Sequence, residues 1–293
     1  MPWTTSDRVV ELRAKHTWVD IGVETLDGWR RHLSGRNASL LSFWFFLSIF
    51  PLLLVATTVL GFVLQDNQSL QEDIIDGALA DIPVLGAQLQ NDPTSLTGNI
   101  WVLIFGLLGA LWSATKAFVG LQGALDDIWE VPVDGRPPMP VQRGKALLGI
   151  LIVGGAQIGS MALAAIVRAA DLPAAGDIAI LASTAVVNVG ALWLAFRYLT
   201  TATPAWSVIL PGAVVGGIVF SLIQNFGTLI VTTITENASD TYGQFALVLG
   251  LVTWLGLLAI TMLMCGEMNA AIRSHRDGGL PSAGSQPAAA PSS

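Results

Sequence analysis

The stretch SLLSFWFFLSIFPLLLVATTVLGFVL, residues 39–64, contains no charged side chain. A helix of this length rises about 39 Å at 1.5 Å per residue, which exceeds the roughly 30 Å of hydrocarbon in a bilayer. Because the apolar residues run without a polar face, the stretch is not the half-buried helix of a water-soluble domain. The polar residues 1–38 before it are too long for a signal peptide, so we interpret it as a retained membrane span.

Five further stretches repeat this pattern, in a chain with 53% hydrophobic and 12% charged residues, where a soluble domain has about 25% charged. The sequence therefore predicts an all-α fold, a polytopic bundle of six transmembrane helices. The predicted spans are residues 39–64, 99–121, 145–167, 178–199, 207–233 and 245–265.

The distribution of lysine and arginine predicts the orientation of these spans. The connection 65–98 has no basic residue but several acidic ones, whereas the connection 122–144 carries Arg136 and Arg143. If the six spans alternate in direction, every basic residue outside the second span except Arg168 falls on the same side of the membrane. Because basic loops stay in the cytoplasm, both termini are predicted to be cytoplasmic.

Outside the spans we expect three features. Residues 1–38 form a cytoplasmic segment with an amphipathic helix, which either lies at the membrane interface or packs on the cytoplasmic side of the bundle. Apolar residues within 65–98 are spaced as in a short helical external cap. Residues 277–293 are rich in Pro, Ala, Gly and Ser and are expected to be disordered. The transmembrane domain is then 39–276.

The motifs of common enzyme classes are missing from the sequence. There is no phosphate-binding loop, no H-E-x-x-H pair and no G-x-S-x-G elbow. The single cysteine, Cys265, forms no intrachain disulfide, and none of His16, His32 and His275 lies in a predicted span. We therefore expect no enzymatic activity, metal or cofactor. Without a surface of mixed basic and aromatic residues, we expect membrane lipids and not nucleic acid as partners.

Polar groups at membrane depth are candidate functional residues, because each costs free energy unless it is paired or hydrated. Lys116 and Glu267 are predicted at similar depth toward the cytoplasmic leaflet, so we hypothesise that they pair. An equally weighted alternative is that Lys116 reaches to the interface and Glu267 is hydrated there. The candidates for a substrate path are Lys116, Arg197, Glu267, Asn269, Gln122 and Asp126.

Proline and glycine mark places where the helices bend or approach each other. Pro51 and Pro211 are predicted to kink the first and fifth spans, with neighbouring helices covering the freed carbonyls. The motifs at Gly155 and Gly159 and at Gly212 and Gly216 are expected to serve packing inside the bundle rather than a dimer. Four amides near mid-membrane line a polar path or, as we favour, bond across helices: Gln157, Asn188, Gln224 and Asn225.

Three blocks carry a family resemblance: ASLLSFWFFLSIFPLLL at 38–54, SATKAFVGLQGALDDIWEV at 113–131 and YGQFALVLGLVTWLGLLAITMLMCGEMNAA at 242–271. The chain resembles the YihY/virulence factor BrkB family from about residue 20 to 275. Residues matching the family pattern are Ser48, Pro51, Tyr242, Gly243, Gly266, Glu267, Asn269 and Ala270. Many members have an asparagine where this chain has Asp126, which puts any role of that amide in doubt.

The resemblance implies a six-span protein of the bacterial inner membrane, linked in some members to export of lipid precursors. We expect transport or flipping of an amphipathic, anionic, lipid-like substrate that enters past Lys116, Arg197 and Glu267. A scaffold for envelope assembly that does not transport, and a small-solute permease, stay open as alternatives. An older ribonuclease label for the family is discounted, because no paired carboxylates have the spacing of a metal site.

Overall fold

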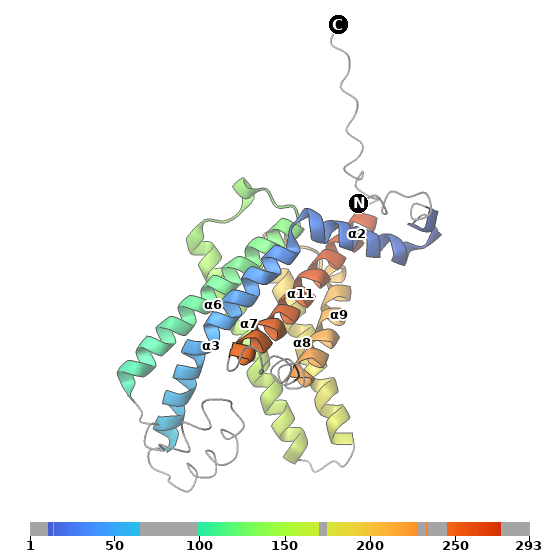
Figure 1. Ribbon diagram of the computed structural model, residues 1–293. Coiled ribbons are helices and arrows are strands. Elements are labelled where there is room, and N and C mark those ends of the chain that lie inside the picture. Colours follow the sequence, from blue (N-terminus) through green and yellow to red (C-terminus); the bar gives the residue numbers. More distant parts are fainter. Residues whose placement is uncertain are drawn as a thin grey trace. The chain divides into compact units, whose positions relative to one another are not determined.

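The computed structural model describes residues 11–13, 15–64, 99–169, 175–227, 233 and 245–276, and all regular elements in these ranges are helices. An all-α fold is thereby confirmed. A short 3-10 helix, η2, spans Val133–Gly135. The α-helices are α2 (Thr17–Arg31), α3 (Ser34–Leu64), α6 (Ile100–Ile128), α7 (Met139–Ala169), α8 (Ala175–Tyr198), α9 (Trp206–Asn225) and α11 (Phe245–Arg276), as labelled in Figure 1.

Five helical segments in the described chain are long and apolar enough to cross a membrane: Ser34–Val55, Ile100–Ile128, Leu181–Tyr198, Trp206–Gln224 and Phe245–Arg276. Between 22% and 33% of the residues in their most apolar windows are buried, so the apolar surface that remains needs hydrocarbon around it. The predicted span 145–167 lies within α7, a helix of 31 residues that does not belong to these five. The six-span count and the cytoplasmic termini stay predictions.

The chain divides into two compact units, which we describe one at a time. Unit 1 comprises Met1–Ser42 and Phe118–Ser293, and unit 2 comprises Phe43–Ala117. The predicted boundary between residues 38 and 39 falls inside α3, which begins at Ser34. The predicted external cap, within 65–98, and the tail 277–293 lie outside the described residues.

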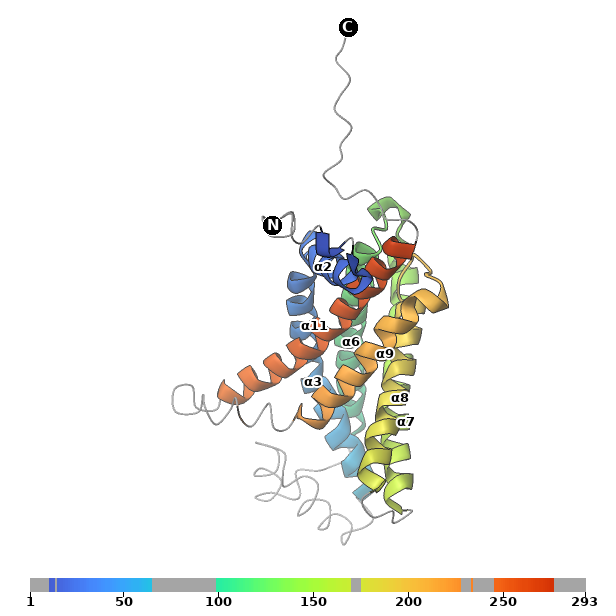
Figure 2. The ribbon, with the colours of Figure 1, turned by 90° about the vertical axis from the view of Figure 1, so that its right-hand side faces the viewer.

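In unit 1, neighbouring helices pack in the order α7, α8, α9 and α11, and α2 lies across the C-terminal end of α11 (Figures 1 and 2). Val23, Thr25 and Gly28 are the buried residues of α2. Its packing on the bundle is thereby confirmed, while Trp18, at 84% exposed, and Leu26 face outward. The position of α2 at the membrane interface stays a prediction.

Glycines let α9 approach both of its neighbours closely. A Cβ on Gly217 would lie 2.6 Å from the backbone nitrogen of Val189 on α8. A Cβ on Gly216 would lie 3.2 Å from the sulfur of Cys265 on α11. The predicted use of this motif for packing inside the bundle is confirmed. The same prediction for Gly155 and Gly159 on α7 is wrong within the described chain, because a Cβ on either residue would meet open space.

Unit 2 contains the second part of α3 and the first part of α6. The rings of Trp44 and Trp112 meet edge to face at a centroid distance of 5.9 Å. A Cβ on Gly109 would lie 3.4 Å from the Cβ of Pro51, so α6 presents a small residue to the proline of α3. Helix α3 continues through Pro51 and α9 through Pro211, and the kinks stay predictions.

The close contact of α8 and α9 generates the first testable prediction. Gly217→Ala should destabilise the protein by about 1–3 kcal/mol, because its Cβ would overlap the rigid backbone of Val189. Gly154→Ala, which points into open space on α7, should change stability by less than about 0.5 kcal/mol. Thermal unfolding of both variants in one detergent measures the difference, and equal unfolding temperatures would contradict the packing described.

Candidate functional site

Five of the six candidate residues lie in unit 1, at the end where α2 crosses α11. Glu267 and Asn269 are on α11, Gln122 and Asp126 are near the end of α6, and Arg197 is in the last turn of α8. All of them except Arg197 are buried. The structure therefore gathers these residues, which are far apart in the sequence, into one region.

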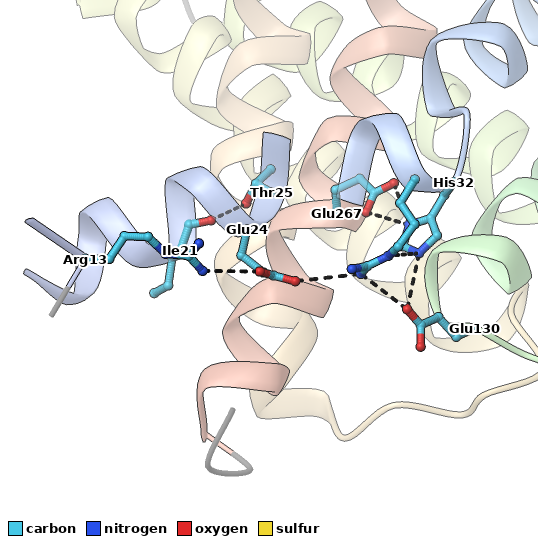
Figure 3. A network of polar contacts seen from close by, with 8 residues as sticks. Arg13, Ile21, Glu24, Thr25, His32, Glu130 and Glu267 are labelled. Carbon is cyan, nitrogen blue, oxygen red and sulfur yellow. Dashed lines mark hydrogen bonds and ion pairs between the residues drawn. The ribbon is translucent and has the colours of Figure 1, made fainter. Parts of the chain in front are cut away.

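Glu267 is the most enclosed charged group of this region, with its side chain 1% exposed. The Oγ of Ser34 donates a hydrogen bond to its Oε1 at 2.5 Å. The Nδ1 of His32 lies 3.0 Å from Oε2 and 3.1 Å from Oε1 (Figure 3). A buried carboxylate is tolerated when it is paired and hydrogen-bonded, and both conditions are met here.

The backbone is shaped around this carboxylate. A Cβ on Gly28 of α2 would lie 2.5 Å from Oε2 of Glu267, so a larger residue there would displace this carboxylate from its present position. Leu33, between His32 and Ser34, has a φ of 54°, in the left-handed region that costs a residue with a side chain about 1–2 kcal/mol. The turn from α2 to α3 is therefore held in a strained conformation that presents both polar partners to Glu267.

Further charges surround the imidazole of His32. Its Nε2 lies 3.5 Å from Oε1 of Glu130 (Figure 3). The guanidinium of Arg31 lies 3.2 Å from the same oxygen. We call Glu267, His32, Ser34, Arg31 and Glu130 the Glu267 cluster. Burial acts to lower the pKa of His32, but the hydrogen bond and the charge of Glu267 outweigh it, and the pKa of His32 is raised above 6.5.

Asp126 holds the turn between α8 and α9. Its Oδ1 accepts hydrogen bonds from Thr200 Oγ1 at 2.8 Å and from the backbone N–H of Thr201 at 2.6 Å. Its Oδ2 accepts the hydroxyl of Thr201 at 2.9 Å. Thr203, in the same turn, has a φ of 44°. Both carboxylate oxygens are used, so the aspartate at this position acts as a three-bond anchor for a strained turn.

Asn269 joins α11 to the backbone of α9 beside Pro211. Its Oδ1 accepts the N–H of Gly212 at 2.8 Å, and its Nδ2 donates to the carbonyl of Ile209 at 3.2 Å. A Cβ on Gly212 would lie 2.5 Å from the side-chain amide of Asn269. The side-chain amide of Asn269 therefore connects α11 to the backbone of α9 on both sides of Pro211.

The remaining candidates also have identified contacts. Gln122 donates from Nε2 to the carbonyl of Gln142 at 2.9 Å. Arg197 donates to the carbonyl of Pro204 at 3.1 Å and stacks over a tryptophan ring at 5.5 Å. In unit 2, the Nζ of Lys116 lies 5.9 Å from the ring of Trp112, and Lys116 is exposed.

Two expectations about polar pairing have different outcomes. Lys116 belongs to unit 2 and Glu267 to unit 1, and the two units are described separately. The pairing of Lys116 with Glu267 therefore stays a prediction. Asn188 donates to Ser221 at 2.9 Å and to Gln224 at 2.8 Å, which confirms that these two amides bond across helices.

His32 and Ser34 are site residues that sequence reasoning missed. The sequence places all three histidines outside the predicted spans, and His32 is separated from α3 by a single residue. The available signal was a short polar segment immediately before the first span, opposite a carboxylate that needs a partner. Among the described residues no group of three or more His, Cys, Asp or Glu side chains is arranged to hold a metal ion.

A groove lies between the first turns of α3 and the middle of α11, wholly within unit 1. Its volume is about 210 Å³, and it is lined by Ala38, Ser39, Ser42, Val252, Gly256 and Ile260. Ser39 donates its hydroxyl to the carbonyl of Gly35 at 3.1 Å, and Ser42 donates to the carbonyl of Val252 at 2.9 Å. Since both hydroxyl protons are used by the backbone, the groove presents a nearly apolar wall.

Comparison with known proteins identifies relatives along most of the chain. The family model described as Virulence factor BrkB matches residues 25–290. The ribonuclease-like protein YfkH of Bacillus subtilis is 24% identical over 275 residues, covering 86% of this chain and 95% of its own. A UPF0761 membrane protein of Alkalilimnicola ehrlichii is 26% identical over 266 residues, covering 88% of this chain and 59% of its own.

A third relative matches a shorter part. The inner membrane protein YhjD of Escherichia coli is 30% identical over 115 residues, which is 37% of this chain and 34% of that protein. No solved structure matches the chain.

The anchoring role of Asp126 generates the second prediction. Asp126→Ala should destabilise the protein by about 1–3 kcal/mol, because the N–H of Thr201 and two hydroxyls lose their acceptor. Asp126→Asn keeps an oxygen for Thr200 and for that N–H and should recover most of the loss. Thermal unfolding ranks the two variants, and an asparagine variant as unstable as the alanine variant would contradict this role.

Proposed function

The chain belongs to the virulence factor BrkB family, and from this membership and the groove between α3 and α11 we propose that it carries an amphipathic, anionic, lipid-like envelope substrate across the membrane. It is a multi-pass protein of the bacterial inner membrane, with five helices able to span it and relatives named as membrane and inner membrane proteins. In this proposal it acts as a carrier without chemical conversion, and its partners are membrane lipids rather than nucleic acid.

The groove is the observation that supports a lipid-like substrate. It lies along two candidate membrane spans, Ser34–Val55 and Phe245–Arg276, and in this proposal acyl chains surround it. Its 210 Å³ is less than the roughly 300–1,000 Å³ of small-molecule pockets, and its wall is apolar. These properties fit a section of an acyl chain better than a polar solute.

Basic side chains support the anionic character of the substrate. Arg36 is exposed on α3, one turn before Ser39 at the edge of the groove. Lys116 is exposed on α6, in unit 2. Cations near the inner leaflet attract phosphate-bearing headgroups, each by about 1 kcal/mol.

The non-transporting scaffold is supported by a different observation. Glu267, Asn269, Gln122 and Asp126 are all buried and all hydrogen-bonded to other helices or turns. Side chains engaged in this way hold the helices of unit 1 together, so these four residues do not offer a solute a continuous row of available polar groups. This arrangement argues against a small-solute permease and keeps the scaffold as the second candidate.

Lipid movement by the reconstituted full chain tests the proposal. In vesicles that contain a fluorescent anionic phospholipid, the protein should make inner-leaflet lipid accessible to a membrane-impermeant quencher. Gly256→Leu should bring the rate down to that of protein-free vesicles, because the added side chain fills the groove. Gly155→Leu, on an open face of α7, is the matched control and should keep the rate.

Two outcomes would count against the proposal. Lipid movement that is unchanged in a folded Gly256→Leu variant would remove the groove from the transport path. Absence of movement by the unaltered protein, with any lipid headgroup, would favour the scaffold.

A further inference from the structure

The Glu267 cluster and the groove both lie along the line where α3 and α11 meet, which we call the seam. Ser34 is one helical turn from Ala38 on α3, about 6 Å along the axis. Glu267 is seven residues beyond Ile260 on α11, about 10 Å along the axis. Helix α2 covers this end of the seam, because Gly28 is packed on the carboxylate of Glu267.

Helix α2 buries few of its side chains completely. Of its 15 residues, Val23, Thr25 and Gly28 are buried and Val19, Ile21 and Trp29 are half-buried, while Trp18 and Leu26 face outward. Polar contacts at both ends of α2 add to this apolar packing on α11: Asp20 contacts His275 near one end, and His32 contacts Glu267 at the other.

His32 has the more enclosed of these contacts. Its imidazole faces Glu267 from α11, Glu130 from the connection after α6, and Arg31 from α2, whose Nε lies 3.3 Å from Nε2. Ser34 of α3 donates to Glu267. Within this set two carboxylates outweigh one guanidinium, so the cluster stabilises an imidazolium. With a neutral imidazole, the buried carboxylate of Glu267 keeps its hydrogen bonds but loses its ionic contact with His32.

We propose that His32 is a proton-binding site that works as a latch: with a proton bound, the imidazolium holds α2 on Glu267 across the end of the seam, and when the proton leaves to water, α2 is released. In the proposed function, release of α2 would admit substrate to the groove, and this step rests on that function. The proton-binding site at His32 and the attachment of α2 do not depend on it.

The direction of the pH dependence follows from the raised pKa of His32. A histidine with a higher pKa in the docked state contributes stability that is fully present below the pKa of the released state, near 6.5. That stability is lost as the pH rises through the docked-state pKa. The latch is closed at low pH and opens at higher pH.

Histidine NMR of the full chain in lipid nanodiscs tests the proton site. The chain has three histidines, so selective isotope labelling gives few signals, assigned by single substitutions. His32 should titrate above 6.5, and Glu267→Gln should move its pKa downward. Glu130→Gln removes a more exposed carboxylate and should lower the pKa of His32 by a smaller amount. This variant replaces Glu267→Gln in the test if Glu267→Gln does not fold. A His32 pKa unaffected by either folded variant would overturn the proposal.

Amide hydrogen exchange of residues 17–31, corrected for the intrinsic effect of pH, tests the latch. Protection should fall by up to about tenfold for each unit by which docking raises the pKa of His32. His32→Gln should give low protection that does not depend on pH. His275→Gln removes the more exposed contact to Asp20 and should keep the pH dependence. Constant protection of α2 across the titration of His32 would overturn the latch, whatever the result of the lipid assay.

Discussion

A carboxylate buried at the end of a membrane-spanning helix has to be paired, and much of unit 1 is arranged to meet this need for Glu267. The pairing brings together Ser34 at the start of α3 and His32 at the end of α2. It requires a glycine where α2 crosses α11 and a left-handed residue in the turn between α2 and α3. Removing one partner of such a pair is costly, about 3–5 kcal/mol, because the other charge is left buried.

The same requirement explains the other polar residues of the bundle. Asn269 satisfies backbone groups of α9 next to Pro211, and Asp126 satisfies a turn that carries a residue with positive φ. Asn188 connects α8 to α9. Asn269, Asp126 and Asn188 thus lie where two elements meet and hold those elements together. The apolar groove, and not a polar channel, is the feature that distinguishes a carrier from a scaffold here.

The helices were largely predictable from the sequence, because runs of apolar residues identify membrane spans directly. Their ends were less predictable: the sixth span was expected at 245–265, with Glu267 and Asn269 beyond it on the same helix, and α11 continues to Arg276. In the folded chain His32 and Ser34 contact Glu267, and Gly212 contacts Asn269. Composition alone does not reveal such distant partners.

The site was predictable in its residue types and less so in its pairings. Glu267 was expected either to pair with Lys116 or to be hydrated, and the contact made within unit 1 comes from His32, which lies outside every predicted span. Similarly, two glycine motifs look alike in sequence, yet Gly212 and Gly216 face neighbouring helices while Gly155 and Gly159 face open space. Spacing along one helix does not say which face a second helix will cover.

A double-mutant cycle between His32 and Glu267 tests the central claim most directly. The free energy of unfolding would be measured in one detergent for the unaltered chain, for His32→Gln, for Glu267→Gln and for the double variant. A direct ionic contact predicts that the double variant is less damaged than the sum of the single variants, with a coupling of about 1–3 kcal/mol. Additive losses would show that the two side chains do not hold α2 and α11 together.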